Sequence, residues 1–164
     1  MSRFGLLMLV LLSGCQTADL ADSRHAGAHD AAAGPVPHAV RVRALAKADW
    51  SRMESLSFEL RDYGVSPREL RLKAGQPYKL TISNSGSVSH YFNAPEFLHS
   101  IAARKAEVPH QAEIKADFFT SFEISRRGGS MDLYFIPVVA GVYRAHCHLE
   151  GKEHEGVVGT LIVE

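Results

Sequence analysis

The sequence predicts an all-β fold, a Greek-key β-sandwich or barrel with one short inserted helix. Three observations support this fold class. Apolar and polar residues alternate in several short segments, which is the pattern of half-buried strands. Clusters of Gly, Pro, Asn and Ser separate these segments and predict turns. The chain has 164 residues, 46% of them hydrophobic, which suits one globular domain of about 100–200 residues.

The alternating segments begin at residue 40. Alternation predicts strands at residues 40–43, 56–60, 70–72 and 78–82. In the first of these, Val40 and Val42 alternate with arginines. Turn residues at 74–77 and 84–87 separate the later segments, as expected for strands that reverse direction.

A change of rhythm predicts the helix at residues 95–106, PEFLHSIAARKA. Pro95 suits the first helical turn, and Phe97 and Ile101 have helical spacing. The strand pattern then returns at residues 118–124, 131–136, 142–147 and 158–163. Roughly eight short strands in all are typical of a sandwich or Greek-key barrel.

Charge and cysteine content limit the kinds of function that this chain can have. The chain has 18 Lys and Arg against 18 Asp and Glu, so its formal net charge is zero. Nucleic-acid binders usually carry a basic excess that neutralises phosphates, and we therefore expect no nucleic-acid partner. Only Cys15 and Cys147 are present, so no disulfide framework is expected. Nine histidines suggest a metal.

The N-terminus has the features of an export signal. Arg3 precedes a nine-residue apolar run, Phe4–Leu12, which is too short to span a bilayer but suits a signal peptide. The following Leu-Ser-Gly-Cys resembles a bacterial lipobox. This resemblance implies that residues 1–14 are removed and that Cys15 is lipidated, and Gln16 after it favours the outer membrane. The alternative is an ordinary buried helix beginning at Met1.

Residues 15–38 are predicted to form the lipidated N-terminus and a flexible tether, and residues 39–164 the β-domain. The tether is rich in Ala, Gly and Asp and has almost no bulky apolar residue. Its histidines, His25, His29 and His38, are either solvated spacer residues or loose metal ligands. The anchor would place the protein at the periplasmic face of the cell envelope.

The segment 141–161, GVYRAHCHLEGKEHEGVVGTL, carries the most informative chemistry. Side chains alternate between the two faces of a strand. Tyr143, Ala145 and Cys147 should therefore face the core, and His146 and His148 should face outward. This alternation places a thiol inward at the end of a strand, beside a loop rich in Gly, Glu and His.

This segment resembles the cupredoxin family of small copper proteins. Its Gly-x-Tyr-x-x-x-Cys strand matches residues 141–147, and residues 70–84, followed by His90, resemble the strand and turn that deliver the first histidine ligand. Residues 156–161 resemble the closing strand of the family. The resemblance covers roughly residues 55–164 and implies that His90 and Cys147 bind copper. A His₂Cys set with a weak axial group is a blue-copper site.

The rest of the ligand loop departs from the family pattern. The expected histidine and methionine positions hold Lys152 and Val157. Lysine is a poor ligand near neutral pH, because lowering its pKa from about 10.4 to 7 costs roughly 4.6 kcal/mol. His154 is the favoured third ligand, through a longer loop. His148 is the second choice, and it gains access if the strand ends at Cys147.

The function we expect is copper binding by a lipid-anchored periplasmic protein, in copper handling or single-electron transfer. Its partners would be the copper ion, the membrane through the anchor, and a redox or copper-transfer protein in the periplasm. The alternative is a degenerate, copper-free cupredoxin that acts as an envelope protein-interaction module. His146 and His148 could form half of an outward metal site, with His99 or a tether histidine. We expect no enzyme, because no catalytic triad, phosphate loop or haem motif has interpretable spacing.

Overall fold

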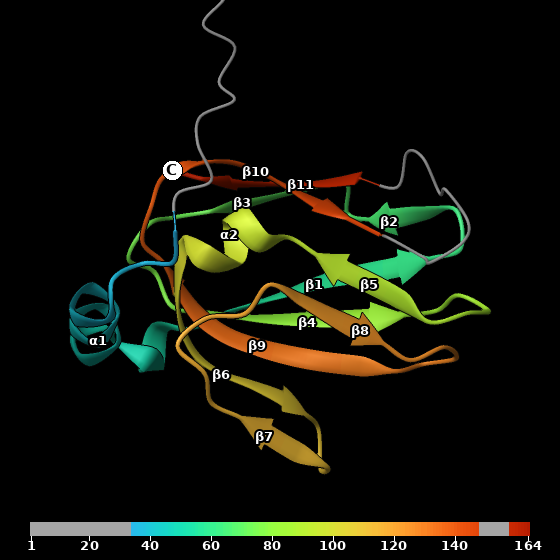
Figure 1. The fold of residues 1–164 in the computed structure, drawn as a ribbon, viewed down its shortest axis with the longest axis horizontal. Helices are drawn as coiled ribbons and strands as arrows, with labels where there is room; N and C mark the ends of the chain where they lie inside the picture. Colours follow the sequence, from blue (N-terminus) through green and yellow to red (C-terminus); the bar gives the residue numbers. More distant parts are fainter. Residues whose placement is uncertain (1–33, 148–157) are drawn as a thin grey trace, which may run out of the picture. The chain divides into compact units, whose positions relative to one another are not determined.

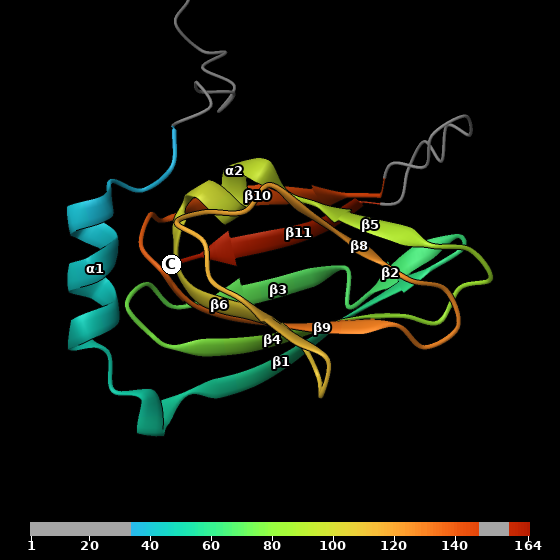
Figure 2. The ribbon, with the colours of Figure 1, turned by 60° about the horizontal axis from the view of Figure 1, so that its bottom comes forward.

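A computed structural model describes residues 34–147 and 158–164 of the chain. Two β-sheets dominate this part (Figures 1 and 2). The six-stranded sheet has the order β2-β1-β4-β9-β6-β7, and the five-stranded sheet has the order β3-β11-β10-β5-β8. This arrangement confirms the expected all-β sandwich. No helix in the described residues is long and apolar enough to cross a membrane.

The strands of the two sheets alternate along the chain. The six-stranded sheet consists of β1 (Glu54–Arg61), β2 (Gly64–Ser66), β4 (Tyr78–Asn84), β6 (Ile101–Val108), β7 (Ala112–Ile114) and β9 (Ser130–Pro137). The five-stranded sheet consists of β3 (Glu69–Leu72), β5 (His90–Asn93), β8 (Ser121–Ile124), β10 (Gly141–His146) and β11 (Val158–Val163). β1 runs parallel to β4, and β3 runs parallel to β11, whereas the other pairs are antiparallel.

The core lies between the sheets and is rich in aromatic rings. Phe58 of β1 meets Phe92 of β5 edge to face, with 5.3 Å between ring centroids. Both rings are fully buried. Along β4 every second residue is buried, as the period of two requires. The last buried position of β4 is a polar residue, Asn84, and the candidate site lies near it.

Residues 40–43 lie in a helix, so the prediction of a strand there is wrong. α1 (His38–Lys47) includes it, and its buried residue is Arg41. The guanidinium of Arg41 contacts His38 and Asp117, while the two valines face solvent, 38% and 47% exposed. The alternation of valine and arginine at residues 40–43 therefore does not mark a strand with one buried face. The good helix formers that follow, Ala-Leu-Ala-Lys, favour the helix.

The predicted inserted helix is present but shorter than expected. α2 (Pro95–His99) begins with Pro95, and its chain then enters strand β6. Ser100 ends the helix, because its hydroxyl donates to the Phe97 carbonyl at 2.8 Å. Ile101 then pairs with Pro137 on β9. The long antiparallel contact with β9 outweighs the helical spacing of the apolar residues. Four strands, β2, β5, β6 and β7, were not predicted from the sequence.

Candidate metal centre

Three chain segments meet at one end of the sandwich and form the candidate site. β5 begins at His90, Cys147 directly follows β10, and the turn between β1 and β2 carries Asp62. β5 and β10 are neighbours in the five-stranded sheet, with Asn93 opposite His146. Figure 1 shows the β1–β2 turn, the β4–β5 loop and the end of β10 on the same side.

The structure brings His90 and Cys147 into direct contact. Nδ1 of His90 lies 3.1 Å from Sγ of Cys147. The two residues are 1% and 8% exposed, so the contact lies inside the protein. The inward orientation of Cys147 follows the predicted alternation of β10, where Ala145 is also buried and His146 is exposed.

The other ring nitrogen of His90 is bound to a carboxylate. Nε2 of His90 lies 3.1 Å from Oδ1 of Asp62, within hydrogen-bond distance. The backbone N–H of Ser87 donates to both carboxylate oxygens, at 2.8 and 3.0 Å. The hydrogen bond from His90, followed by those from Ser87, holds the pKa of Asp62 below its ordinary value although desolvation opposes this. An ionised carboxylate only accepts hydrogen bonds, so the proton of a neutral His90 is on Nε2 and the Nδ1 lone pair faces Cys147.

The loop after β4 holds this arrangement from behind. The amide of Asn84 is fully buried and donates to the carbonyls of Val88 and Ile124 at 2.8 and 2.9 Å. Its oxygen accepts from the N–H of Gly86 at 2.7 Å. A Cβ at Gly86 would lie 2.5 Å from the Asp62 oxygen and 2.6 Å from Nε2 of His90. The contact between Asp62 and His90 therefore requires glycine at this position.

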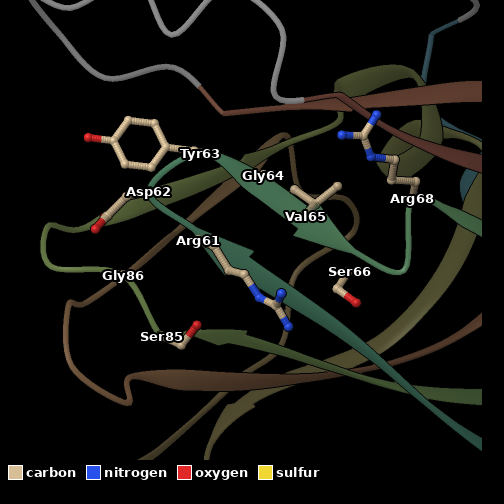
Figure 3. A pocket seen from close by; sticks show the side chains of 9 residues that line it. All are labelled: Arg61, Asp62, Tyr63, Gly64, Val65, Ser66, Arg68, Ser85 and Gly86. Atoms are coloured by element: carbon tan, nitrogen blue, oxygen red, sulfur yellow. The ribbon is translucent and has the colours of Figure 1, made fainter.

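A surface pocket lies against the same carboxylate (Figure 3). Its volume is about 570 Å³, and its lining residues are Arg61, Asp62, Tyr63, Gly64, Val65, Ser66, Arg68, Ser85 and Gly86. Figure 3 shows Asp62 and Gly86 on one side of this pocket and Arg68 on the other. The Asp62 side chain is 31% exposed. Asp62 therefore separates the buried histidine from the surface.

The order of the three groups, Cys147–His90–Asp62, is also that of a nucleophilic triad. Nucleophilic attack requires an accessible thiolate with a lowered pKa. Burial instead raises the pKa of the Cys147 thiol, and a backbone hydrogen bond from Tyr91 opposes the rise only in part. A soft metal ion deprotonates a coordinating thiol outright. The site is therefore better suited to metal binding than to nucleophilic catalysis.

The donor set fits copper. Thiolate and imidazole are ligands that copper accepts. Metal-binding histidines commonly donate their second ring nitrogen to a carboxylate, as His90 does to Asp62. Within residues 34–147 and 158–164, no three His, Cys, Asp or Glu side chains form a group that could hold a metal ion. Those residues thus contribute the pair His90 and Cys147, and a complete site needs further ligands.

The remaining predicted ligands either lie outside the described residues or form no metal-binding group with His90 and Cys147. His148, Lys152, His154 and Val157 lie outside the described residues, as do Cys15 and the tether residues His25 and His29. His146 is exposed, as its predicted outward orientation requires. His99, considered for an outward site, packs edge to face on Phe118 with 5.2 Å between ring centroids. His38 lies 3.5 Å from Asp117.

Asp62 is the site residue that the sequence analysis did not identify. It lies in the β1–β2 turn, 28 residues before His90. An Asp before Tyr-Gly in a turn is common for local reasons, because Asp favours turns. No spacing rule connects it to a histidine at the start of another strand. The contact is a product of the way the two sheets pack.

Similarity to known proteins is found at the level of solved structures. No protein-family model and no curated protein matches the chain. A multicopper oxidase from Campylobacter jejuni, described as a metallo-oxidase, matches with a TM-score of 0.51 and 15% identity over 71% of this chain. The match spans 31% of that oxidase. At this identity it confirms the expected cupredoxin-like sandwich as a fold.

Two auracyanin structures match less closely in TM-score. The dithionite-reduced auracyanin from the photosynthetic bacterium Roseiflexus castenholzii has a TM-score of 0.47 and 15% identity, over 67% of this chain and 96% of its own. Auracyanin B has a TM-score of 0.45 and 14% identity, over 68% of this chain and 88% of its own.

Proposed function

We propose that this protein is a lipid-anchored, cupredoxin-like copper-binding protein of the periplasm. The observation that supports it best is the buried contact of 3.1 Å between Nδ1 of His90 and Sγ of Cys147. A hydrogen bond to Asp62 holds the second nitrogen of His90. This pairing is the expected inner half of a copper site, and the sandwich resembles a domain-sized part of a multicopper oxidase.

His90 and Cys147 would hold the copper ion together with a group from the loop at residues 148–157. His154 is the first choice for this group, His148 the second and Lys152 the third. Copper bound there would supply one-electron chemistry between Cu(I) and Cu(II). The protein residues bind the ion, orient His90 and exclude water, since both described donors are almost fully buried.

Copper handling is the favoured role, and single-electron transfer is the second. A buffer or carrier mainly needs affinity, and an irregular ligand loop with many histidines suits it. An electron carrier gains from a constrained site of standard composition. In either role the protein would meet a partner that takes copper or an electron, at the periplasmic face of the envelope.

The decisive experiment is a Cu(II) titration of the metal-free full-length chain, followed by visible absorption and EPR. The two cysteines offer a matched pair of variants, Cys147→Ser and Cys15→Ser. We expect an intense thiolate-to-copper band that is lost in Cys147→Ser and retained in Cys15→Ser. No band in the unsubstituted chain, with weak binding equal in both variants, would overturn the copper–cysteine site. The copper-free interaction module would then be the better explanation.

The same titration identifies the ligand from the loop. His154→Ala should abolish or shift the band, and His148→Ala and Lys152→Ala should preserve it. His110→Asn is the control, because His110 lies in the exposed turn between β6 and β7. Loss of the band in His148→Ala alone would overturn His154 as the ligand. Reversible reduction with fast electron exchange would favour electron transfer over copper handling.

A further inference from the structure

We propose that Asp62 is the positioning residue of the copper site: it holds His90 in the metal-binding tautomer and favours bound Cu(II) over Cu(I). The inference rests on the copper-binding function proposed above. It concerns a residue that takes no direct part in binding the ion and acts through His90.

The first argument is the tautomer of His90. A neutral imidazole has one N–H and one lone pair, and its surroundings decide which nitrogen carries which. The Asp62 carboxylate accepts from Nε2 at 3.1 Å. Nδ1, 3.1 Å from Sγ of Cys147, then carries the lone pair that a metal needs. A partner that could donate to Nε2 would move the proton to Nδ1 and block the site.

The second argument is that the carboxylate is itself held in place. The N–H of Ser87 donates to both of its oxygens, at 2.8 and 3.0 Å. Ser87 belongs to the loop that Asn84 and Gly86 organise, and the close approach of Gly86 leaves no room for a side chain between Asp62 and His90. The carboxylate therefore reaches His90 in one orientation.

The third argument is charge. A neutral acceptor would satisfy the N–H of His90 equally well as a hydrogen-bond partner, so the negative charge has a separate effect. It increases the electron donation of the imidazole to a bound ion. The more highly charged oxidation state gains most from this, and Cu(II) should be favoured. Asp62 keeps its charge at low cost because its side chain is 31% exposed at the surface pocket.

The test compares Asp62→Asn with Asp62→Glu in the full-length Cys15→Ser chain, which leaves one thiol. Asparagine keeps the size of the side chain and accepts from Ser87, but it is neutral and its amide can donate to Nε2. Asp132→Asn is the matched control: Asp132 also accepts a side-chain hydrogen bond, from Thr81 at 2.6 Å, and lies on β9. Urea unfolding of each variant reports whether folding is retained.

Two readouts separate positioning from a merely structural role. ¹⁵N NMR of the metal-free, histidine-labelled protein should show His90 with its proton on Nε2, and Asp62→Asn should shift it toward Nδ1. His90→Gln identifies the signal. In the copper-loaded protein, Asp62→Asn should weaken Cu(II) binding by about 10–100-fold and raise the reduction potential, and Asp62→Glu should restore part of both.

The outcomes distinguish this proposal from the proposed function. If the unsubstituted chain binds no copper but the tautomer shifts in Asp62→Asn, the proposed function fails and the positioning of His90 by Asp62 is supported. If copper binds, and Asp62→Asn matches Asp132→Asn in tautomer, affinity and potential, the positioning role is overturned.

Discussion

At the scale of single residues, the candidate site depends on groups that have no metal chemistry of their own. Asn84 is fully buried and uses its amide to shape the loop before His90. Gly86 lets the Asp62 carboxylate approach the imidazole. Buried polar groups of this kind are costly unless they are paired, so their pairing around His90 indicates a loop with one preferred conformation.

Gly86→Ala should damage the site directly. The added methyl group would meet the Asp62 oxygen at 2.5 Å and Nε2 of His90 at 2.6 Å, so one of them must move. We expect weaker Cu(II) binding and a free energy of unfolding lower by about 1–3 kcal/mol. Copper titration and urea unfolding measure the two effects.

The control for this change is Gly64→Ala. Gly64 lines the same surface pocket, but a Cβ there has no neighbour within 4 Å. The Cu(II) affinity of Gly64→Ala should equal that of the unsubstituted chain. Its free energy of unfolding should change by no more than about 0.5 kcal/mol. Equal copper affinity in the two variants would contradict the role assigned to Gly86.

At the scale of elements, the two sheets approach closely where Gly159 of β11 faces Phe58 of β1. A Cβ at Gly159 of β11 would lie 2.5 Å from Cζ of Phe58 on β1. Phe58 in turn packs on Phe92 of β5, the strand that begins with His90. The packing of this glycine therefore influences the position of the strand that carries the candidate ligand.

A double-mutant cycle tests this contact. Gly159→Ala alone should lower the free energy of unfolding by about 1–3 kcal/mol because the core is overpacked. Phe58→Leu frees space, so the alanine should cost less in that background, with a coupling of at least about 0.5 kcal/mol. Gly64→Ala should add independently to Phe58→Leu. Additive effects for Gly159→Ala would show that the ring does not limit the approach of the sheets.

The β6–β7 hairpin and the residue after it carry a partly exposed charge network with a defined pH dependence. Lys105 lies 2.6 Å from Glu107 and 2.8 Å from Glu113, and Lys115 lies 3.0 Å from Glu113. These lysines, Lys105 first, lower the pKa of Glu113 to about 2. A lowered carboxyl pKa stabilises the fold above the unfolded value, near 4.5, and this contribution is lost as the pH falls to about 2.

Glu113→Gln should therefore lower the thermal stability slightly near pH 6 and leave it unchanged near pH 2. This loss of stability should be small and should weaken with added salt. The Glu113 side chain is 43% exposed, and solvent and salt screen its ion pairs with the lysines. Thermal unfolding at both pH values, with and without salt, measures it. Glu54→Gln is the control, since the described residues offer Glu54 no ion pair. A difference that grew toward pH 2 would contradict the assignment.

At the scale of the whole molecule, the start of the described chain is tied to the sandwich. The N–H of Val36 donates to the His99 carbonyl at 2.8 Å, and Arg41 of α1 contacts Asp117. Val36 and Arg41 therefore join the start of the described chain to α2 and to the loop before β8. The candidate copper site is carried by other elements, β5 and the end of β10.

The proposed lipid anchor makes a prediction for the complete chain in a bacterial host. Radiolabelled palmitate should be incorporated into the unsubstituted chain and into Cys147→Ser, because both retain Cys15. Cys15→Ser should carry no label and should leave the membrane fraction. Labelling of Cys15→Ser, or a membrane-free unsubstituted chain, would contradict lipidation at this cysteine. The two cysteine variants thus serve as controls for each other here and in the copper titration.

Local patterns predicted the features that depend on the chain alone. The alternation along β10 placed Cys147 inward, because the pleat of a strand turns successive side chains to opposite faces whatever surrounds them. The same rule located β1, β3 and β4. It failed at residues 40–43, which lie in α1. The buried Arg41 contacts Asp117, 76 residues further along the chain, and no local pattern contains such a contact.

Long-range contacts decided the rest. His90 was singled out through family resemblance, but its two partners, Cys147 and Asp62, lie 57 and 28 residues away in the sequence. Their meeting depends on β5 pairing with β10 and on the β1–β2 turn folding over the end of the sandwich. The sequence alone thus determined most of the half-buried strands and the direction of the thiol, since both follow from local geometry. Only the tertiary structure placed a carboxylate on the histidine, because that contact joins segments whose separation follows no local period.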